Sequence, residues 1–152
     1  MPACASTVLE LGAGVGVASL CLARRLAHTQ VYALELQPDY AALAQRNAQE
    51  NGLPITVYQG DLVQMPAPLR QMRFDHVIAN PPYGGRIGNK KLLYALYGSF
   101  GTVMKERFSG WRVGIITNEG GLAHATGLPL KSGPPVDHGG LKVKLYQTAP
   151  LP

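Results

Sequence analysis

Short apolar runs alternate along this chain with longer segments whose apolar residues recur every three or four positions. Buried strands are nearly continuous apolar runs, whereas amphipathic helices space their apolar residues three and four apart. The apolar runs predict strands at residues 7–11, 31–36, 55–58, 74–79 and 111–117. The helical spacing predicts helices at residues 17–28, 38–51, 90–108 and 118–127.

Strands that alternate with helices predict right-handed β-α-β crossovers and a doubly wound, mostly parallel sheet. We therefore expect an α/β, Rossmann-like fold in a single domain of residues 1–152. One segment differs, because residues 141–146 alternate apolar and basic side chains after a Gly/Pro-rich stretch at 131–140. This segment predicts a half-exposed strand that runs antiparallel at or near the sheet edge.

The composition is that of a globular protein, with 46% apolar and 15% charged residues in 152. Gly, Arg and Pro interrupt each apolar run before it is long enough to span a bilayer. The first residues lack the basic start and apolar stretch of a signal peptide, so we expect a cytoplasmic protein with no membrane partner. Cys4 and Cys21 have no metal-ligand spacing, so we expect no metal.

Three glycines, Gly12, Gly14 and Gly16, lie between the first predicted strand and its helix. Glycine lets the chain turn tightly and brings backbone N–H groups close to a ligand. The dinucleotide fingerprint Gly-x-Gly-x-x-Gly/Ala is not met, because Val17 or Ser19 occupies its third position in the two registers. The loop therefore favours another adenosine-containing cofactor over NAD.

Acidic residues stand at or just after the ends of three successive predicted strands, at Glu10, Glu35 and Asp61. The carboxyl ends of parallel strands form the ligand-binding edge of open α/β sheets. Glu35 is expected to accept hydrogen bonds from both hydroxyls of a ribose. Asp61 is expected to accept one from an adenine amine, with Leu62 packing nearby. The alternative for Asp61 is a plain turn or helix-capping residue.

The tetrapeptide Asn80-Pro81-Pro82-Tyr83 follows the predicted strand 74–79. The Asn80 carboxamide oxygen and the Pro81 carbonyl can both accept hydrogen bonds from a planar, conjugated amine. The prolines stiffen the segment, and Tyr83 offers a flat face on which a base can stack. The alternative interpretation is a simple turn after a strand.

These motifs together resemble class I S-adenosylmethionine-dependent methyltransferases that modify exocyclic amines. Residues 7–83 resemble the bacterial tRNA adenine-N6 methyltransferases, through "VLELGAGVGVASLCLA", "VYALELQPDYAALAQRNAQENGL" and "FDHVIANPPY". Residues 80–146 resemble the catalytic domains of THUMP-type RNA guanine-N2 methyltransferases, through "NPPYGGRIG", "LYALYGSFGTVMKERFSGWRVGIIT" and "HGGLKVKLY". The resemblance implies methyl transfer from S-adenosylmethionine to adenine N6 or guanine N2 of an RNA. It also implies that Glu10 meets the positive amino group of the methionine moiety, directly or through water.

The charge is divided unevenly. Residues 1–69 carry three basic and five acidic side chains, a net of −2, and residues 70–152 carry eleven basic and four acidic ones, a net of +7. A basic surface beside an amine-binding segment favours an RNA substrate, a tRNA or an rRNA. Arg86, Lys90 and Lys91 are expected to bind its phosphates; the alternative is a solvated surface.

Two further functions stay open on the sequence alone. A protein glutamine amide is also a planar –NH₂ group, so a glutamine N-methyltransferase would suit the same tetrapeptide. The resembling families carry an upstream segment that helps cover the cofactor, and here the first predicted strand starts at residue 7. A truncated or engineered core that binds cofactor without turnover is therefore the third hypothesis.

Overall fold

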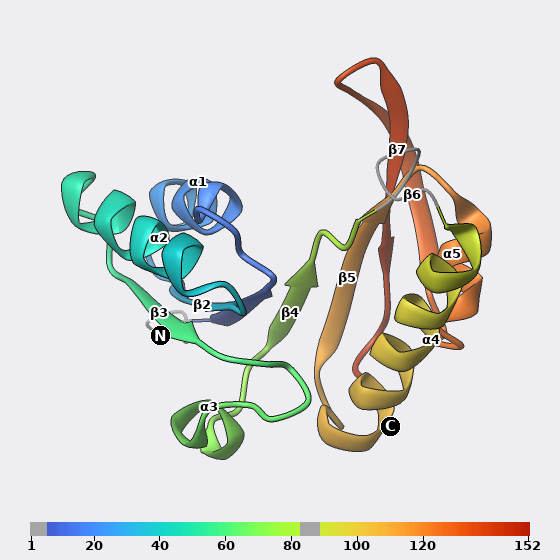
Figure 1. The fold of residues 1–152 in the computed structure, drawn as a ribbon, viewed down its shortest axis with the longest axis horizontal. Coiled ribbons are helices and arrows are strands. Elements are labelled where there is room, and N and C mark those ends of the chain that lie inside the picture. Colours follow the sequence, from blue (N-terminus) through green and yellow to red (C-terminus); the bar gives the residue numbers. More distant parts are fainter. Residues whose placement is uncertain (1–5, 83–88) are drawn as a thin grey trace. The chain divides into compact units, whose positions relative to one another are not determined.

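The computed structural model describes residues 6–82 and 89–152 (Figure 1). The chain forms two compact units, Met1–Ile78 and Ala79–Pro152.

Within residues 6–78, the first unit contains three helices and four strands, and the last residue of the fourth strand opens the second unit. The strands are β1 (Thr7–Leu11), β2 (Gln30–Glu35), β3 (Ile55–Gln59) and β4 (His76–Ala79). The helices are α1 (Val17–Arg25), α2 (Pro38–Glu50) and α3 (Ala67–Gln71). β2 lies between β1 and β3 and pairs in parallel with both, with Leu11 opposite Leu34 and Glu35 opposite Gln59. The predicted parallel β-α-β units are therefore confirmed.

The core of this unit lies where α1 and α2 cover one face of the strands (Figure 1). Small alanines let the helices approach closely, since Ala23 of α1 and Ala48 of α2 pack with Val31 and Ala33 of β2. The burial of these apolar side chains between helices and strands is the main force that stabilises the parallel strand pairs.

The second unit contains α4 (Lys90–Arg107), β5 (Arg112–Thr117), α5 (Gly120–Ala125), β6 (Lys131–His138) and β7 (Leu141–Gln147). β7 lies between β5 and β6 and pairs antiparallel with both. The predicted antiparallel C-terminal strand is therefore confirmed, and β7 lies next to the sheet edge. No strand was predicted in the Gly/Pro-rich stretch 131–140, which contains the edge strand β6.

The edge position explains how two prolines fit into β6. Proline has no N–H to donate to a strand ladder and is confined to edges and irregular positions. The register between β6 and β7 shifts between Ser132 and Pro135, where these prolines lie. The hairpin closes at Gly139 and Gly140, whose φ angles of 57° and 82° suit the tight turns that join such strands.

The remaining predicted elements differ from the observed ones at their ends. The helix expected at 17–28 ends at Arg25, the strand expected at 74–79 begins at His76, and α3 was not predicted. Five residues are too few for helical periodicity to be recognised. No helix in the described part of the chain is long and apolar enough to cross a membrane.

Asn89 explains where α4 begins. Its side-chain oxygen accepts hydrogen bonds from the backbone N–H groups of Lys91 at 3.0 Å and Leu92 at 3.3 Å. These contacts satisfy two donors that would otherwise lack a partner at a helix N-terminus. The buried side of α4 carries apolar residues three and four apart: Leu93, Tyr97, Phe100 and Met104.

Candidate functional site

The glycine loop between β1 and α1 is anchored to the end of β2. The N–H groups of Gly12 and Ala13 donate to the carbonyl oxygen of Leu34, at 2.9 and 3.1 Å. Gly12, Gly14 and Gly16 have φ angles of 66°, 56° and 87°, which favour glycine over residues with a side chain. The backbone therefore turns at all three positions in the way that the glycines of this loop predicted.

The loop also has an open side. A Cβ atom built on Gly12 or Gly14 would find no atom within 4 Å, whereas one on Gly16 would lie 3.1 Å from the Cβ of Ala44. Gly16 thus permits close packing against α2, while Gly12 and Gly14 leave room above the backbone. A ligand of the first unit can approach the chain closely at those two positions.

Glu35 joins the loop to the end of β2. Its side chain is only 7% exposed. One oxygen, Oε2, accepts the N–H of Gly14 at 2.7 Å, and the other, Oε1, accepts the N–H of Gln37 at 2.8 Å. An ionised carboxylate has about four acceptor positions, so this group retains capacity for a ligand hydroxyl pair. Glu35 is the last residue of β2. Its contact with a ribose stays a prediction.

Glu10 is tied to the start of α1. It is 5% exposed, and its Oε2 accepts the backbone N–H of Ser19 at 2.9 Å and also the Ser19 hydroxyl. Burial raises the pKa of the Glu10 carboxyl; the bonds from Ser19 oppose that effect, and the negative charge of Glu35 adds to it. The sequence analysis missed Ser19, although a hydroxyl in the first turn of a helix is a common partner for a nearby carboxylate.

Asp61 lies just after β3 and is exposed. Its Oδ1 accepts the N–H of Val63 at 2.8 Å, which is the local turn anticipated as the alternative role. The N–H of the preceding Gly60 donates to the carbonyl oxygen of Glu35 at 2.9 Å. This bond joins the end of β2 to the segment just after β3, where Asp61 and the half-buried Leu62 follow Gly60. Contact of Asp61 and Leu62 with a ligand stays a prediction.

The Asn-Pro-Pro segment opens the second unit. Asn80 and Pro82 are exposed and Pro81 is half-buried, while Tyr83 and Arg86 lie outside the described residues. The hydroxyl of Tyr97, on α4, donates toward two consecutive carbonyl oxygens, at 3.3 Å for Pro82 and 3.5 Å for Pro81. Tyr97 is buried. Its contact with this segment was not predicted from the sequence.

Lys90 and Lys91 occupy the first turn of α4 and are exposed. Cations in the first turn oppose the helix dipole, so these side chains do not serve the stability of α4. Both lie about two turns before Tyr97 on the same helix. Their predicted contact with phosphates stays a prediction.

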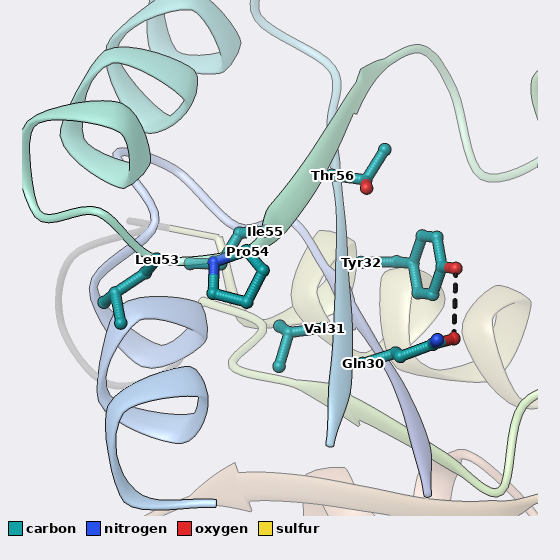
Figure 2. Close-up of a pocket in the computed structure, with 7 residues that line it drawn as sticks. All are labelled: Gln30, Val31, Tyr32, Leu53, Pro54, Ile55 and Thr56. Carbon is teal, nitrogen blue, oxygen red and sulfur yellow. Dashed lines mark hydrogen bonds between the residues drawn. The ribbon is translucent and has the colours of Figure 1, made fainter. Parts of the chain in front are cut away.

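A pocket of about 290 Å³ lies elsewhere in the first unit (Figure 2). Gln30, Tyr32 and Thr56 line it together with the apolar Val31, Leu53, Pro54 and Ile55. It lies at the amino ends of β2 and β3, whereas Glu35 and Asp61 lie at their carboxyl ends. Its lining contains neither a carboxylate nor a cation, so it lacks the groups expected to bind a cofactor.

Among residues 6–82 and 89–152, no group of three or more His, Cys, Asp or Glu side chains is arranged to hold a metal ion.

Comparison with known proteins places the chain in a family. Residues 16–131 match the model of the RMKL-like methyltransferase domain, UPF0020. Over 124 residues the chain is 30% identical to the ribosomal RNA large subunit methyltransferase K/L of Chromohalobacter salexigens. This match covers 80% of this chain and 17% of that protein. Over 79 residues it is 43% identical to the release factor glutamine methyltransferase of Geobacter sulfurreducens, in a match that covers 52% of this chain and 27% of that protein. The chain thus spans less than a third of the length of these curated relatives.

Among solved structures, TrmN from Thermus thermophilus matches with a TM-score of 0.78 and 26% sequence identity. The match covers 97% of this chain and 44% of that one. It confirms the predicted α/β, Rossmann-like fold of mostly parallel strands with antiparallel strands near the C-terminus.

Proposed function

The chain belongs to the RMKL-like methyltransferase family, and from that premise we propose that it transfers a methyl group from S-adenosylmethionine to an exocyclic amine of an RNA base. The acceptor atom is N6 of adenine or N2 of guanine. The observation that carries the proposal is the Asn80-Pro81-Pro82 segment at the end of β4, in a chain whose glycine loop is bonded to Glu35.

The residues of the first unit fit the cofactor. S-adenosylmethionine supplies a methyl group activated by its positively charged sulfur. Glu35 uses its remaining acceptor positions for the two ribose hydroxyls. The open side of Gly12 and Gly14 lets the ligand lie against the loop. Glu10 faces the amino group of the methionine moiety, directly or through water, while it holds Ser19.

Asp61 and Leu62 complete the adenosine part of this assignment. Asp61 is exposed, and the turn it forms with Val63 engages one carboxylate oxygen, Oδ1. A carboxylate can accept hydrogen bonds on both oxygens, so Asp61 can also receive the adenine amine. Leu62 supplies an apolar contact for the ring.

The residues of the second unit fit the acceptor amine. Its lone pair is delocalised into the base, so the amine is a poor nucleophile until its two N–H bonds are held out of the ring plane. The Asn80 carboxamide oxygen and the Pro81 carbonyl oxygen accept these two N–H groups and hold the lone pair in line. Catalysis by such positioning needs no strong base. Tyr83 stacks on the base once it has left its helix.

An RNA substrate is supported by charge. Residues 79–152 carry nine basic and three acidic side chains, a net of +6. Lys90 and Lys91 are exposed at the start of α4, and Arg86 precedes them in sequence. We assign all three to phosphate contacts, which make affinity dependent on salt. The relative named as a ribosomal RNA large subunit methyltransferase supports an RNA substrate, for which we propose a tRNA or an rRNA, and a cytoplasmic location suits either.

Methyl transfer to purified RNA tests the proposal. The chain is incubated with radiolabelled S-adenosylmethionine and with tRNA or rRNA that lacks its natural modifications, and digestion to nucleosides identifies the methylated atom. Asn80→Ala should lower kcat by about a hundredfold or more, because it removes one of two groups that orient the amine. Asp61→Ala should instead weaken S-adenosylhomocysteine binding in a calorimeter, by roughly tenfold.

The controls separate the effects on the cofactor from those on the acceptor amine. Asn80→Ala should bind S-adenosylhomocysteine as the wild type does, and Asp137→Ala, which removes an exposed carboxylate from β6, should change neither measurement. Cofactor binding without label in any RNA or protein would favour the hypothesis of a core without turnover.

A glutamine amide is the second candidate acceptor. The 43% identity over 79 residues to a release factor glutamine methyltransferase supports it. The same Asn80 and Pro81 oxygens would accept the two N–H groups of the amide. Label recovered in protein, and not in RNA, when both substrates are offered would favour this function.

A further inference from the structure

We propose that Tyr97 is a positioning residue for methyl transfer, because its buried hydroxyl holds the two carbonyl groups of the acceptor segment in place. The inference rests on the proposed function, and it adds a residue of α4 to the acceptor site. Tyr97 does not touch the amine; it acts through Pro81 and Pro82.

The Tyr97 side chain is almost fully buried, so its hydroxyl meets protein groups and not bulk water. The side chain is 1% exposed and belongs to the buried stripe of α4 with Leu93 and Met104. A phenol hydroxyl that is removed from water requires a protein partner. The carbonyl oxygens of Pro82 and Pro81 lie at 3.3 and 3.5 Å, so one proton is shared between two neighbouring acceptors.

The prolines make the segment dependent on such a contact. Pro81 and Pro82 have no N–H, so this stretch of backbone has no donor to offer to a strand ladder or a turn. The backbone of Pro81 and Pro82 can therefore form hydrogen bonds only through its carbonyl oxygens. A donor that reaches both of them from the core of the same unit therefore fixes their directions more effectively than proline stiffness alone.

The arrangement leaves the reactive position available. A carbonyl oxygen has two lone pairs, and the Tyr97 hydroxyl is nearer to Pro82 than to Pro81. The Pro81 oxygen can therefore accept the substrate amine while the neighbouring carbonyl anchors the segment. Because misplacement of a reacting group by about 1 Å can cost a hundredfold in rate, such anchoring should be visible in kcat.

Tyr97→Phe tests the inference, since it removes the hydroxyl and keeps the ring in the core. We expect kcat to fall by about tenfold, as for the loss of one orienting hydrogen bond. The KM for S-adenosylmethionine, the affinity for S-adenosylhomocysteine and the melting temperature should change little. Tyr32→Phe is the matched control: it removes the hydroxyl that donates to Gln30 in the first unit and should leave kcat unchanged.

The carbonyl contact is also measured without the reaction. In protein labelled with ¹³C, the carbonyl resonances of Pro81 and Pro82 should move upfield in Tyr97→Phe, because a hydrogen-bonded carbonyl carbon is deshielded. Tyr32→Phe should leave them in place.

Three results would overturn the inference: unmoved carbonyl resonances, an unchanged kcat in an active enzyme, or a fall in kcat that is matched by lost cofactor binding and a lower melting temperature. The last pattern would make Tyr97 a packing residue. The two proposals can fail separately. If the wild type methylates no RNA but Tyr97→Phe moves the Pro81 and Pro82 carbonyl resonances upfield, the proposed function fails and the anchoring contact stands.

Discussion

At the scale of single residues, two carboxylates organise the glycine loop of the first unit. Glu35 bonds the loop at Gly14, and Glu10 bonds the start of α1 at Ser19. Both side chains are buried, and the charge of Glu35 contributes to the raised pKa of Glu10. The loop is therefore shaped by the chain's own hydrogen bonds, which reduces what a ligand must reorganise when it binds.

We expect the ionisation of Glu10 to lower the stability of the folded chain as pH rises. Burial raises the pKa of this carboxyl above its ordinary value of 4.5, so the folded chain keeps a proton that the unfolded chain has released. The resulting stabilisation is fully present below about pH 4.5 and is lost as pH rises through the folded pKa. In urea unfolding across this range, Glu10→Gln should therefore gain stability relative to the wild type as pH increases.

Glu50→Gln is the control for that experiment, because Glu50 is an exposed carboxylate of the same unit. A difference between Glu10→Gln and the wild type that stays constant with pH would contradict the prediction.

At the scale of elements, the second unit depends on a close approach between α4 and the end of α5. A Cβ atom on Gly101 of α4 would lie 1.8 Å from the carbonyl oxygen of Thr126. Thr126 is held in turn, since its hydroxyl donates to the carbonyl of Ala123 at 2.7 Å and accepts the N–H of Leu128 at 3.1 Å. Glycine lowers helix propensity, and the packing explains why α4 nevertheless contains it at this position.

The two glycines of α4 provide a matched pair of variants. Gly101→Ala should destabilise the chain by about 1–3 kcal/mol or more, because backbone must move to admit the methyl group. Gly98→Ala should be neutral or stabilising by up to about 1 kcal/mol, since its methyl would lie 3.6 Å from the Ala125 carbonyl oxygen in ordinary contact and alanine favours helix. Thermal and urea unfolding measure both changes. Equal effects of the two substitutions would show that the close approach does not limit packing.

At the scale of the whole molecule, charge and chemistry are divided between the two units. Met1–Ile78 carries five basic and six acidic side chains, a net of −1, and it holds the glycine loop and its carboxylates. Ala79–Pro152, with its net of +6, holds the Asn-Pro-Pro segment. This division suits a small adenosine cofactor on one unit and a polyanion on the other.

Removing Lys90 and Lys91 together should therefore weaken RNA binding without affecting the cofactor. We expect the double alanine variant to lose affinity for RNA and to reduce the slope of log K against log salt by roughly 1 to 2, as expected when two phosphate contacts are lost. Filter binding at several salt concentrations measures both quantities. Alanine at Arg24 and Arg25, at the end of α1, removes the same charge from the first unit and is the control; an equal loss there would indicate general electrostatic attraction.

The amino-acid sequence by itself determined the parts of this protein that depend on local pattern. Apolar runs and helical spacing predicted β1 to β5, β7 and the long helices, and the family match confirms the methyltransferase resemblance drawn from the motifs. The tight turns of the loop could be predicted because Gly12, Gly14 and Gly16 mark positions where the backbone can adopt positive φ angles. The acidic residues at the ends of β1, β2 and β3 could be placed on one edge because parallel strands share their direction.

Only the tertiary structure decided the contacts between residues far apart in sequence. β6 lacks an apolar pattern and contains two prolines, so its strand conformation follows from pairing with β7. Glu10 and Ser19, Gly101 and Thr126, and Tyr97 and Pro82 meet because folding brings separate elements together. Periodicity shows which side of an element is buried, but the hydrogen-bond partner of a buried polar group depends on the three-dimensional packing around it.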